Sequence, residues 1–338
     1  MTRSFGVFLQ QERPIAELLD WAGRFDEAGA DSIWVADHLA NPWLPDSLWF
    51  DGWTVLTAMA GRTTSCRLGP LVSNFVLHPP LAMARLVTTL DTISGGRLDV
   101  GLGMGGAAVC RAASSVFERG APLADRFENG LDSLIQLLQD VPMPLAQVEM
   151  PAGRRSPETV RLATPYVQAR RPPIVIGGHG PRMIDIAARV GDRWNIYYPP
   201  CVERADELGE ALRRINERFE ERCAVYGRSG EVERSIAFDV APGLQPATRS
   251  EMRELVARMW DLGYDECIAW GWPLADGTNR SIEELLAFVT EGLPGAQDGM
   301  TYRPAATALP RTRSRRAIGG GERFARHDTR RRFSRRCR

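Results

Sequence analysis

Short β-rich runs alternate with amphipathic segments along the first 291 residues, and this alternation constrains the fold more than any other feature of the chain. Eight strand-like runs are predicted, at residues 4–9, 32–36, 67–75, 97–102, 173–176, 193–198, 235–240 and 266–270. An amphipathic helix is predicted after each run, because apolar residues recur there at intervals of three and four. Strict alternation of this kind requires parallel strands with the helices packed outside them.

Eight consecutive strand–helix units of about 36 residues are typical of an α/β fold of the (β/α)8 TIM-barrel type. An open, doubly wound sheet is the alternative, although eight consecutive units would be long for one. Residues 141–172 are rich in Pro and Arg and are expected to form an excursion from the barrel. A helix is expected to begin at Asp125, with Glu128 three residues on as the partner in a capping box.

The last part of the chain differs from the rest in charge. Residues 301–338 carry 13 Arg against two acidic residues, a net charge of +11, whereas the whole chain sums to zero. Residues 292–338 show no apolar periodicity, so we expect a barrel over 1–291 followed by a disordered basic tail. A nucleic-acid-binding arm is the alternative for this tail. The acidic body, with a net charge of −11, opposes that alternative, so nucleic acid is not an expected partner.

Composition and motifs indicate a cytoplasmic protein. The N-terminus has only a few apolar residues before Gln10, which is too short for a secretory signal. The longest uncharged run, 68–84, contains three prolines and cannot form a spanning helix. The six cysteines are widely spaced with no C-x-x-C pair, which is typical of a reduced compartment. No motif with metal-ligand spacing occurs, so no metal is expected.

The loops that follow barrel strands carry function in this fold, and two of them hold polar residues of interest. Asp37 and His38 follow the second predicted strand, with Trp43 in the same loop. Imidazole titrates near neutrality, so His38 is a candidate general base or proton donor with Asp37 beside it. A histidine that only hydrogen-bonds its own loop is the alternative. The third strand ends with Val72, Ser73 and Asn74, and the small polar groups among them would hydrogen-bond a planar ring or merely cap the strand end.

Glycines follow the fourth and fifth strands. The run 101–106, GLGMGG, is rich in glycine. A flat cofactor or its phosphate could contact the backbone there directly, at Gly103, Gly105 and Gly106, because glycine has no side chain. The run also satisfies G-x-G-x-x-G, but a dinucleotide fingerprint usually follows a first strand rather than a fourth. The second group precedes a predicted helix and consists of Gly177, Gly178, His179 and Gly180. Amides at a glycine turn and a helix N-terminus bind anions, so a phosphate is expected here, with charge added by Arg182.

Three segments of the sequence resemble conserved blocks of the luciferase-like monooxygenase family. They are residues 90–103 (LDTISGGRLDVGLG), the segment 173–195 that begins PIVIGGHGPR, and residues 34–38 (WVADH). The blocks occur in order at the expected barrel positions, and the resemblance spans about residues 1–290. It implies a barrel that binds reduced FMN or the deazaflavin F420 and acts on a small-molecule substrate. A homodimer is compatible with this resemblance.

Asp37-His38 followed by Pro42-Trp43 is more similar to the F420-dependent branch of that family. The resemblance implies that the histidine transfers a proton near the deazaflavin. It also implies a bulge with a non-prolyl cis peptide on the third strand, expected here around residues 71–73. It therefore implies F420-dependent hydride transfer to or from a small organic substrate. The alternative is an FMN-dependent monooxygenase that uses reduced flavin and oxygen. Some F420 enzymes carry a Glu after the strand-four glycines, where this chain has Ala107.

Overall fold

The computed structural model describes most of the first 292 residues. The described ranges are 3–41, 46–105, 121–139, 143–144, 159–160, 166–197, 205–238, 248–270 and 280–292. All of them belong to the first of the two units into which the chain divides, Met1–Ala306. The predicted basic tail beyond residue 292, and the site residues Trp43 and Gly106, lie outside these ranges. No helix in the described ranges is long and apolar enough to cross a membrane.

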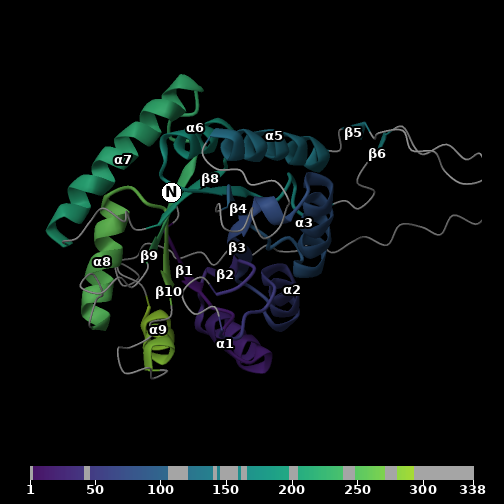
Figure 1. The fold of residues 1–338 in the computed structure, drawn as a ribbon. Coiled ribbons are helices and arrows are strands. Elements are labelled where there is room, and N and C mark those ends of the chain that lie inside the picture. Colours follow the sequence, from purple (N-terminus) through teal and green to yellow (C-terminus); the bar gives the residue numbers. More distant parts are fainter. Residues whose placement is uncertain are drawn as a thin grey trace, which may run out of the picture. The chain divides into compact units, whose positions relative to one another are not determined.

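Eight parallel strands close into a barrel (Figure 1). They are β1 (Ser4–Phe8), β2 (Ser32–Asp37), β3 (Arg67–Asn74), β4 (Val100–Gly103), β7 (Ile174–Gly177), β8 (Arg193–Tyr197), β9 (Glu233–Phe238) and β10 (Glu266–Trp270). Each strand pairs with its neighbours in chain order, and β1 pairs with both β2 and β10. That double pairing closes the barrel. It confirms the predicted (β/α)8 fold and excludes the open sheet.

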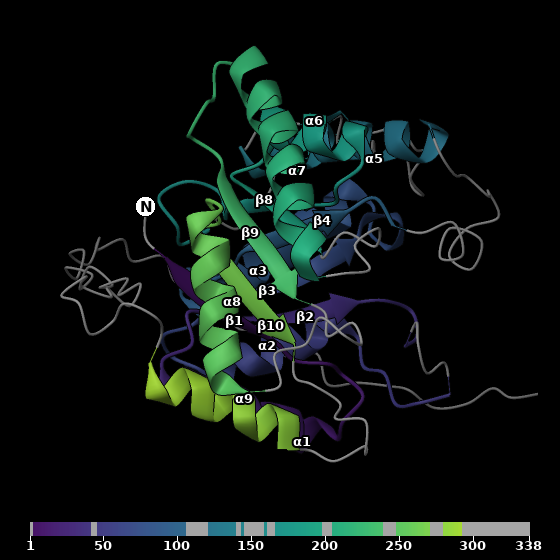
Figure 2. The same ribbon diagram turned by 90° about the vertical axis from the view of Figure 1, so that its left-hand side faces the viewer.

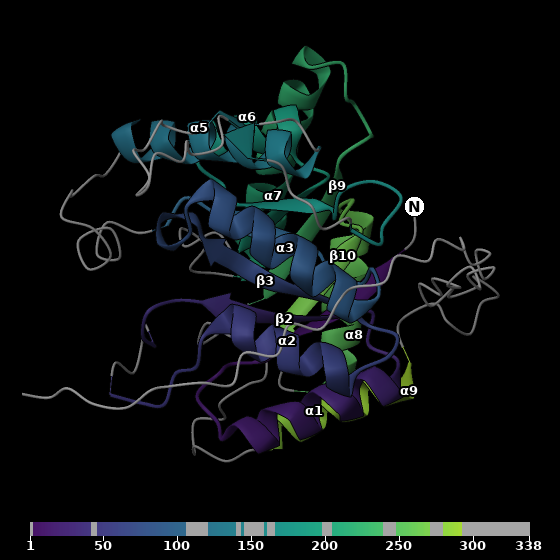
Figure 3. The same cartoon turned by 90° about the vertical axis from the view of Figure 1, so that its right-hand side faces the viewer.

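Each barrel strand is followed by a helix that packs outside the barrel. The helices are α1 (Ile15–Ala28), α2 (Gly52–Arg62), α3 (Pro80–Ser94), α5 (Ala121–Leu138), α6 (Pro181–Val190), α7 (Ala205–Val225), α8 (Arg249–Asp261) and α9 (Arg280–Glu291). Figure 2 faces α7 and α8, and Figure 3 shows α1, α2 and α3 side by side on another face. The predicted start of α5 at Asp125 was wrong, because the helix begins one turn earlier at Ala121.

The predicted excursion at 141–172 contains a short antiparallel pair, β5 (Met143–Pro144) and β6 (Thr159–Val160). These strands do not join the barrel. Besides β5 and β6, the described chain between β4 and β7 consists of residues 104–105, 121–139, which include α5, and 166–173. The barrel therefore keeps eight strands although ten strands occur in the described chain.

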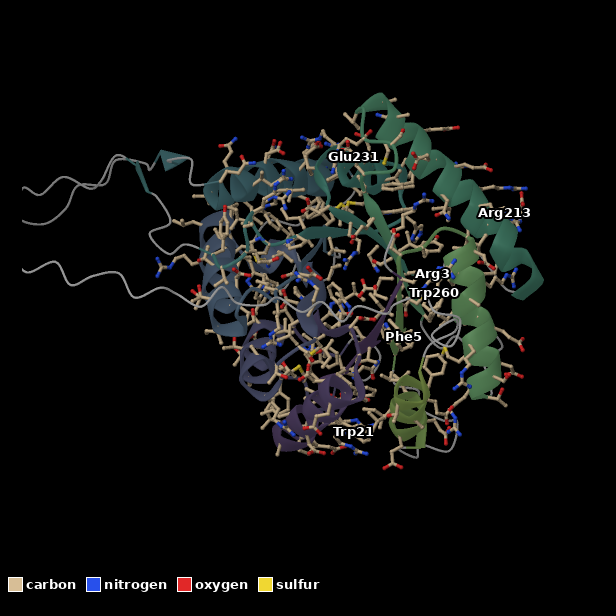
Figure 4. All side chains as sticks on the ribbon, turned by 180° about the vertical axis from the view of Figure 1, so that it is seen from behind. Arg3, Phe5, Trp21, Arg213, Glu231 and Trp260 are labelled. Atoms are coloured by element: carbon tan, nitrogen blue, oxygen red, sulfur yellow. The ribbon has the colours of Figure 1, made fainter. Side chains whose placement is uncertain are left out.

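Apolar side chains fill two layers of the barrel. Between strands and helices, Phe5 of β1 packs against Phe288 of α9, with ring centroids 5.1 Å apart. Figure 4 labels Phe5, and also Arg3 and Trp260, whose guanidinium carbon and ring centroid lie 5.3 Å apart. Inside the barrel, a second cluster is formed by Phe8, Trp34, Ala36, Val175, Ala237, Ile268 and Trp270. Burial of this apolar surface from both faces of the strands stabilises the fold.

The amino-terminal ends of the strands hold a buried ionic cluster. Arg193 lies 2.9 Å from Glu266 and 3.4 Å from Asp99, and Arg67 pairs with Asp99 at 2.5 Å. Burial raises the pKa of Asp99, but Arg67 and then Arg193 lower it by more, so the carboxylate stays ionised. Buried charges are tolerated when each has partners of opposite sign. This cluster closes the floor of the barrel, so the opposite, carboxyl ends of the strands are left for function.

Candidate functional site at the carboxyl ends of the strands

A bulge in β3 shapes the rim of the barrel. Val35 of β2 pairs with Pro70, but Asp37 pairs with Ser73, so β3 has one more residue than β2 between these pairs. The peptide bond between Leu71 and Val72 is cis. Both features lie in the predicted segment 71–73, so this expectation is confirmed. Bulges redirect side chains at barrel rims, and this one brings residues 72–74 to the end of β3.

The side chain of Val72 occupies the space beside two of the predicted cofactor-binding glycines. A Cβ atom added to Gly103 would lie 2.4 Å from Cγ2 of Val72, and one added to Gly177 would lie 2.7 Å from Cγ1. Real Cβ atoms do not approach other carbons so closely, so glycine is required at both positions to admit the valine. These glycines therefore have a packing role, and Val72 is the residue that covers them.

Asp37 is the centre of a hydrogen-bond network at the ends of β2 and β3. Its side chain is 3% exposed. Its Oδ2 atom accepts from the Ser73 hydroxyl at 2.5 Å and from the Asn74 amide N–H at 3.2 Å, and it lies 2.8 Å from Nε2 of His78. The indole N–H of Trp53 donates to the Ser73 hydroxyl at 3.0 Å. Asp37 is thus fixed by β3 and by the turn that follows it.

His78 was missed in the sequence, where Asp37 was paired with its neighbour His38. The two histidines differ in surroundings, because His38 is exposed whereas His78 is largely buried. Among the described residues, the carboxylate of Asp37 is bonded to His78 and not to His38. The sequence offered one signal, the run His78-Pro79-Pro80 shortly after the third strand, but nothing in it placed His78 against Asp37.

His38 lies on the rim beside Trp49. The indole N–H of Trp49 donates to the carbonyl of His38 at 2.9 Å, and their ring centroids are 6.5 Å apart. The surrounding protein lowers the pKa of His38 below its ordinary value by partial desolvation, and the charge of Asp37 opposes this shift. The imidazole is therefore neutral near pH 7, which is the form that accepts a proton.

Asn74 carries a buried amide with no partner. Neither the oxygen nor the nitrogen of its side chain makes a hydrogen bond in the described structure, although the residue is 2% exposed. Bare backbone lies against it, since a Cβ added to Gly105 would be 2.2 Å from Oδ1 of Asn74. Buried polar groups without partners are rare and costly, so this amide is a candidate contact for a bound polar group.

The predicted phosphate turn at 177–180 lies between β7 and α6. Gly178 has φ +133°, and its N–H already donates to the carbonyl of Asn195 at 3.0 Å. Gly180 is the N-cap of α6, with no side-chain cap and no atom within 4 Å of the place of a Cβ. The free amides of the first turn of α6 are therefore the donors that remain for an anion.

Two side chains near this turn differ in what they offer an anion. Arg182, expected to add charge, instead contacts Asp125 at 2.6 Å and Glu128 at 2.7 Å on α5. His179 is exposed. The positive end of the α6 dipole, rather than Arg182, is thus the main favourable charge at the turn.

One family model and several known proteins are similar to this chain. The model of the family described as luciferase-like monooxygenase matches residues 2–323. The 5,10-methylenetetrahydromethanopterin reductase of Methanolobus tindarius is 26% identical over 191 residues, 56% of this chain and 52% of that protein. The chain thus spans about half the length of this curated relative.

Solved structures show the same fold at low sequence identity. An F420-dependent secondary alcohol dehydrogenase in complex with an F420–acetone adduct superposes with a TM-score of 0.70 at 16% identity, covering 86% of this chain and 99% of that one. The oxygenating constituent of 3,6-diketocamphane monooxygenase of Pseudomonas putida, in complex with FMN, gives a TM-score of 0.64 at 13% identity, covering 87% and 99%. Both likenesses establish the barrel and leave the cofactor of this chain open.

Proposed function

The chain belongs to the luciferase-like monooxygenase family, and from this premise we propose that it is an oxidoreductase that transfers a hydride between F420 and a small organic substrate. The observation that carries the proposal is the unpartnered amide of Asn74 at the carboxyl end of β3. A deazaflavin or flavin offers an N–H flanked by carbonyl oxygens along one edge of its ring. A carboxamide has the donor and the acceptor that complement such an edge.

The residues around Asn74 fit the other parts of such a cofactor. Val72 would support the face of the ring from the β3 bulge, and Ser73 holds Asp37 in place through its hydroxyl. The first turn of α6, entered through Gly180, would hold the phosphate with its free amides. His38, neutral near pH 7, would accept a proton from the substrate or return it. When bound, F420 supplies hydride chemistry.

FMN-dependent oxygenation is the second candidate function. The deazaflavin has carbon in place of the ring nitrogen at the oxygen-reactive edge, so it carries hydride and does not serve oxygenation. Asn74 and the α6 turn suit the shared parts of both cofactors. The preference for F420 rests on the sequence after β2, in which Asp37 and His38 are followed by Trp43. One structural neighbour, an F420-dependent secondary alcohol dehydrogenase, supports this preference.

Titration of the protein with each cofactor tests the proposal. We expect F420 to bind with a lower dissociation constant than FMN in a fluorescence titration. Asn74→Ala should weaken cofactor binding by at least tenfold, about 1.4 kcal/mol. The same substitution should leave the melting temperature of the free protein unchanged or raised, because it removes an unsatisfied buried group.

Asn129→Ala is the matched control, since Asn129 is exposed on α5 and should not affect binding. Tighter binding of FMN, with oxygen consumed after its reduction, would instead establish the monooxygenase. If Asn74→Ala binds both F420 and FMN as tightly as the unaltered protein does, the ring of the cofactor does not lie at Asn74. A cytoplasmic location and a homodimeric state are part of the same proposal.

A further inference from the structure

Gln11, three residues after the end of β1, has a fully buried side chain. Its Nε2 donates to the carbonyl of Ala36 at 2.6 Å and to the carbonyl of Phe50 at 3.1 Å. Its Oε1 accepts from the Ala36 N–H at 3.0 Å. The carboxamide is therefore bonded to backbone through both its donor and its acceptor. Ala36 is the residue of β2 just before Asp37 and His38.

Gln11 extends the contact between β1 and β2 beyond the last paired residues of the two strands. The paired residues end at Phe8 and Trp34, and the N–H of Leu9 then donates to the Trp34 carbonyl at 2.9 Å. Ala36, two residues further along β2, bonds to the Gln11 side chain through both its N–H and its C=O. A carboxamide has the donor and the acceptor of a peptide group, so it takes the place of a strand residue here. As a result, β2 is held up to its penultimate residue.

The same carboxamide holds the segment that lies against His38. Phe50, which accepts from Gln11, is adjacent to Trp49, and the Trp49 indole N–H donates to the His38 carbonyl at 2.9 Å. The chain around His38 is therefore tied at two places, since Ala36 is joined to Phe50 through Gln11 and His38 is joined to Trp49 directly. These two ties lie within three residues of each other on the β2 side, so together they restrain the backbone from 36 to 38.

We propose that Gln11 is a positioning residue for His38: its carboxamide holds the end of β2 so that the His38 imidazole keeps one place on the rim of the barrel. The imidazole is exposed, so its place depends on the backbone that carries it. A group that transfers a proton needs this restraint, because a displacement of about 1 Å can lower a rate about 10²-fold. The inference rests on the proposed function in one respect, the transfer of a proton by His38.

A buried amide that only stabilises the fold is the alternative role for Gln11. Both roles predict a lower melting temperature for a variant without the carboxamide, because the backbone groups of Ala36 and Phe50 lose their partner. Only a positioning role predicts a change at His38 in the folded variant. The state of the His38 imidazole is therefore the measurement that separates the two roles.

The test is a pH titration of the His38 imidazole by NMR in the full-length protein without cofactor. Gln11→Met keeps a side chain of similar length and removes both hydrogen-bonding groups. We expect the His38 pKa of this variant to rise toward the ordinary histidine value, because partial desolvation is the main cause that lowers it and a loosened loop admits water to the imidazole. Gln136→Met is the matched control, since Gln136 is exposed on α5, and it should leave the His38 pKa unchanged.

Turnover supplies a second measurement. In Gln11→Met, kcat with F420 should fall about tenfold or more, while the dissociation constant of F420 stays within about threefold. This difference is expected because the bonds of Gln11 go to Ala36 and Phe50 rather than to Asn74 or the first turn of α6. Cofactor titration separates the two proposals, since a protein that binds no F420 refutes the proposed function, whereas the His38 titration still decides the role of Gln11.

A His38 pKa that Gln11→Met leaves unchanged would overturn the proposal, even if the melting temperature falls. An unchanged kcat in the folded variant would overturn it as well. Hydrogen exchange of the unaltered protein keeps the test independent of a variant that fails to fold. The Ala36 N–H should exchange as slowly as the other amides of β2, and exchange at the rate of an exposed loop amide would remove the contact on which the inference depends.

Discussion

Asp37 shows how a sequence can indicate a polar residue at the barrel rim without indicating the side chain that contacts it. Its position after the second strand and its acidity are visible in the sequence. Its hydrogen-bond partner is His78, 41 positions further along, which the turn after β3 carries back to it. The two histidines around this carboxylate therefore have different surroundings, one exposed on the rim and one largely buried. Experiments on single residues can separate them.

Replacement of His38 by alanine should lower kcat by about 10² to 10⁴-fold while cofactor affinity stays within about threefold. The pKa of His38 is lowered, so its neutral form persists below the ordinary histidine range. For substrate oxidation, in which His38 accepts a proton, kcat should therefore stay constant until the pH falls to that lowered pKa and should decrease below it. The alanine variant should lack this acid limb. A kcat that survives within about threefold would make His38 structural.

Gly180→Asp should separate helix stability from phosphate binding. A side chain at Gly180 meets no atom within 4 Å, and an Asp at an N-cap accepts from the first free amides of α6. The melting temperature should therefore rise, while cofactor affinity falls at least about tenfold because a carboxylate takes the place of the phosphate.

Gly61→Asp is the control for the added charge. Its side chain also meets no atom within 4 Å, and it lies on α2. Its cofactor affinity should equal that of the unaltered protein. If Gly180→Asp binds the cofactor normally, the phosphate is held elsewhere. Gly178 is a poorer position for this test, since a side chain at φ +133° is strained and would meet Met183.

At the scale of elements, the sequence predicted what depends on local periodicity. The strand predicted at 193–198 is β8, Arg193–Tyr197, and the helix predicted at 181–189 is α6. The start of α5 was missed because Asp125 and Glu128 form a capping-box pattern inside the helix, where both pair with Arg182 instead. The orphaned amide of Asn74 and the packing of Val72 arise from tertiary contacts, which no local pattern encodes.

A carboxylate also joins two elements on the outer side of the barrel. Asp26 near the end of α1 accepts hydrogen bonds from the backbone N–H groups of Thr64, Ser65 and Cys66, just before β3. Burial raises its pKa, but the Cys66 N–H, the Ser65 hydroxyl and the other donors lower it by more. The pKa of Asp26 thus lies below its ordinary value, and the ionised form stabilises the fold.

Asp26→Asn should lower the free energy of unfolding at pH 7 by about 1–3 kcal/mol, because an amide NH2 then faces donors that need an acceptor. The carboxylate contributes its stability above the ordinary Asp pKa and loses it as pH falls through the lowered, folded-state value. The difference between variant and unaltered protein in urea unfolding should therefore shrink on acidification. A constant difference across acid pH would show that ionisation of Asp26 is not responsible.

At the scale of the whole molecule, the barrel is closed by contacts between two described strands, β1 and β10. β10 pairs with β1 through five residues, from Glu266 opposite Ser4 to Trp270 opposite Phe8. α9 then lies against α1, and it ends at Glu291. Within the described chain, the ionic cluster around Arg193 is formed by residues of β3, β8 and β10 together with Asp99.

Removal of residues 307–338 should therefore leave cofactor affinity unchanged and the melting temperature within about 4 °C, a change in stability on the order of 1–2 kcal/mol for a protein of this size. Thermal unfolding and cofactor titration of the shortened chain measure both. The family model extends to residue 323, so a loss of folding on truncation would assign residues 307–323 to the barrel. The predicted boundary at 291 would then be wrong.

Because Val72 packs on Gly103 and Gly177, the residues at these three positions should vary together. The Cγ atoms of Val72 fill the space beside Gly103 and Gly177. We therefore expect homologous sequences to have a residue larger than glycine at 103 or 177 only where position 72 is smaller than valine. Gly103→Ala alone should destabilise the barrel, whereas the same change in a Val72→Ala background should be tolerated, giving a favourable coupling energy in a double-mutant cycle. Covariation of positions 72, 103 and 177 would then identify the family members that keep this β3 bulge, whichever ligand each of them binds.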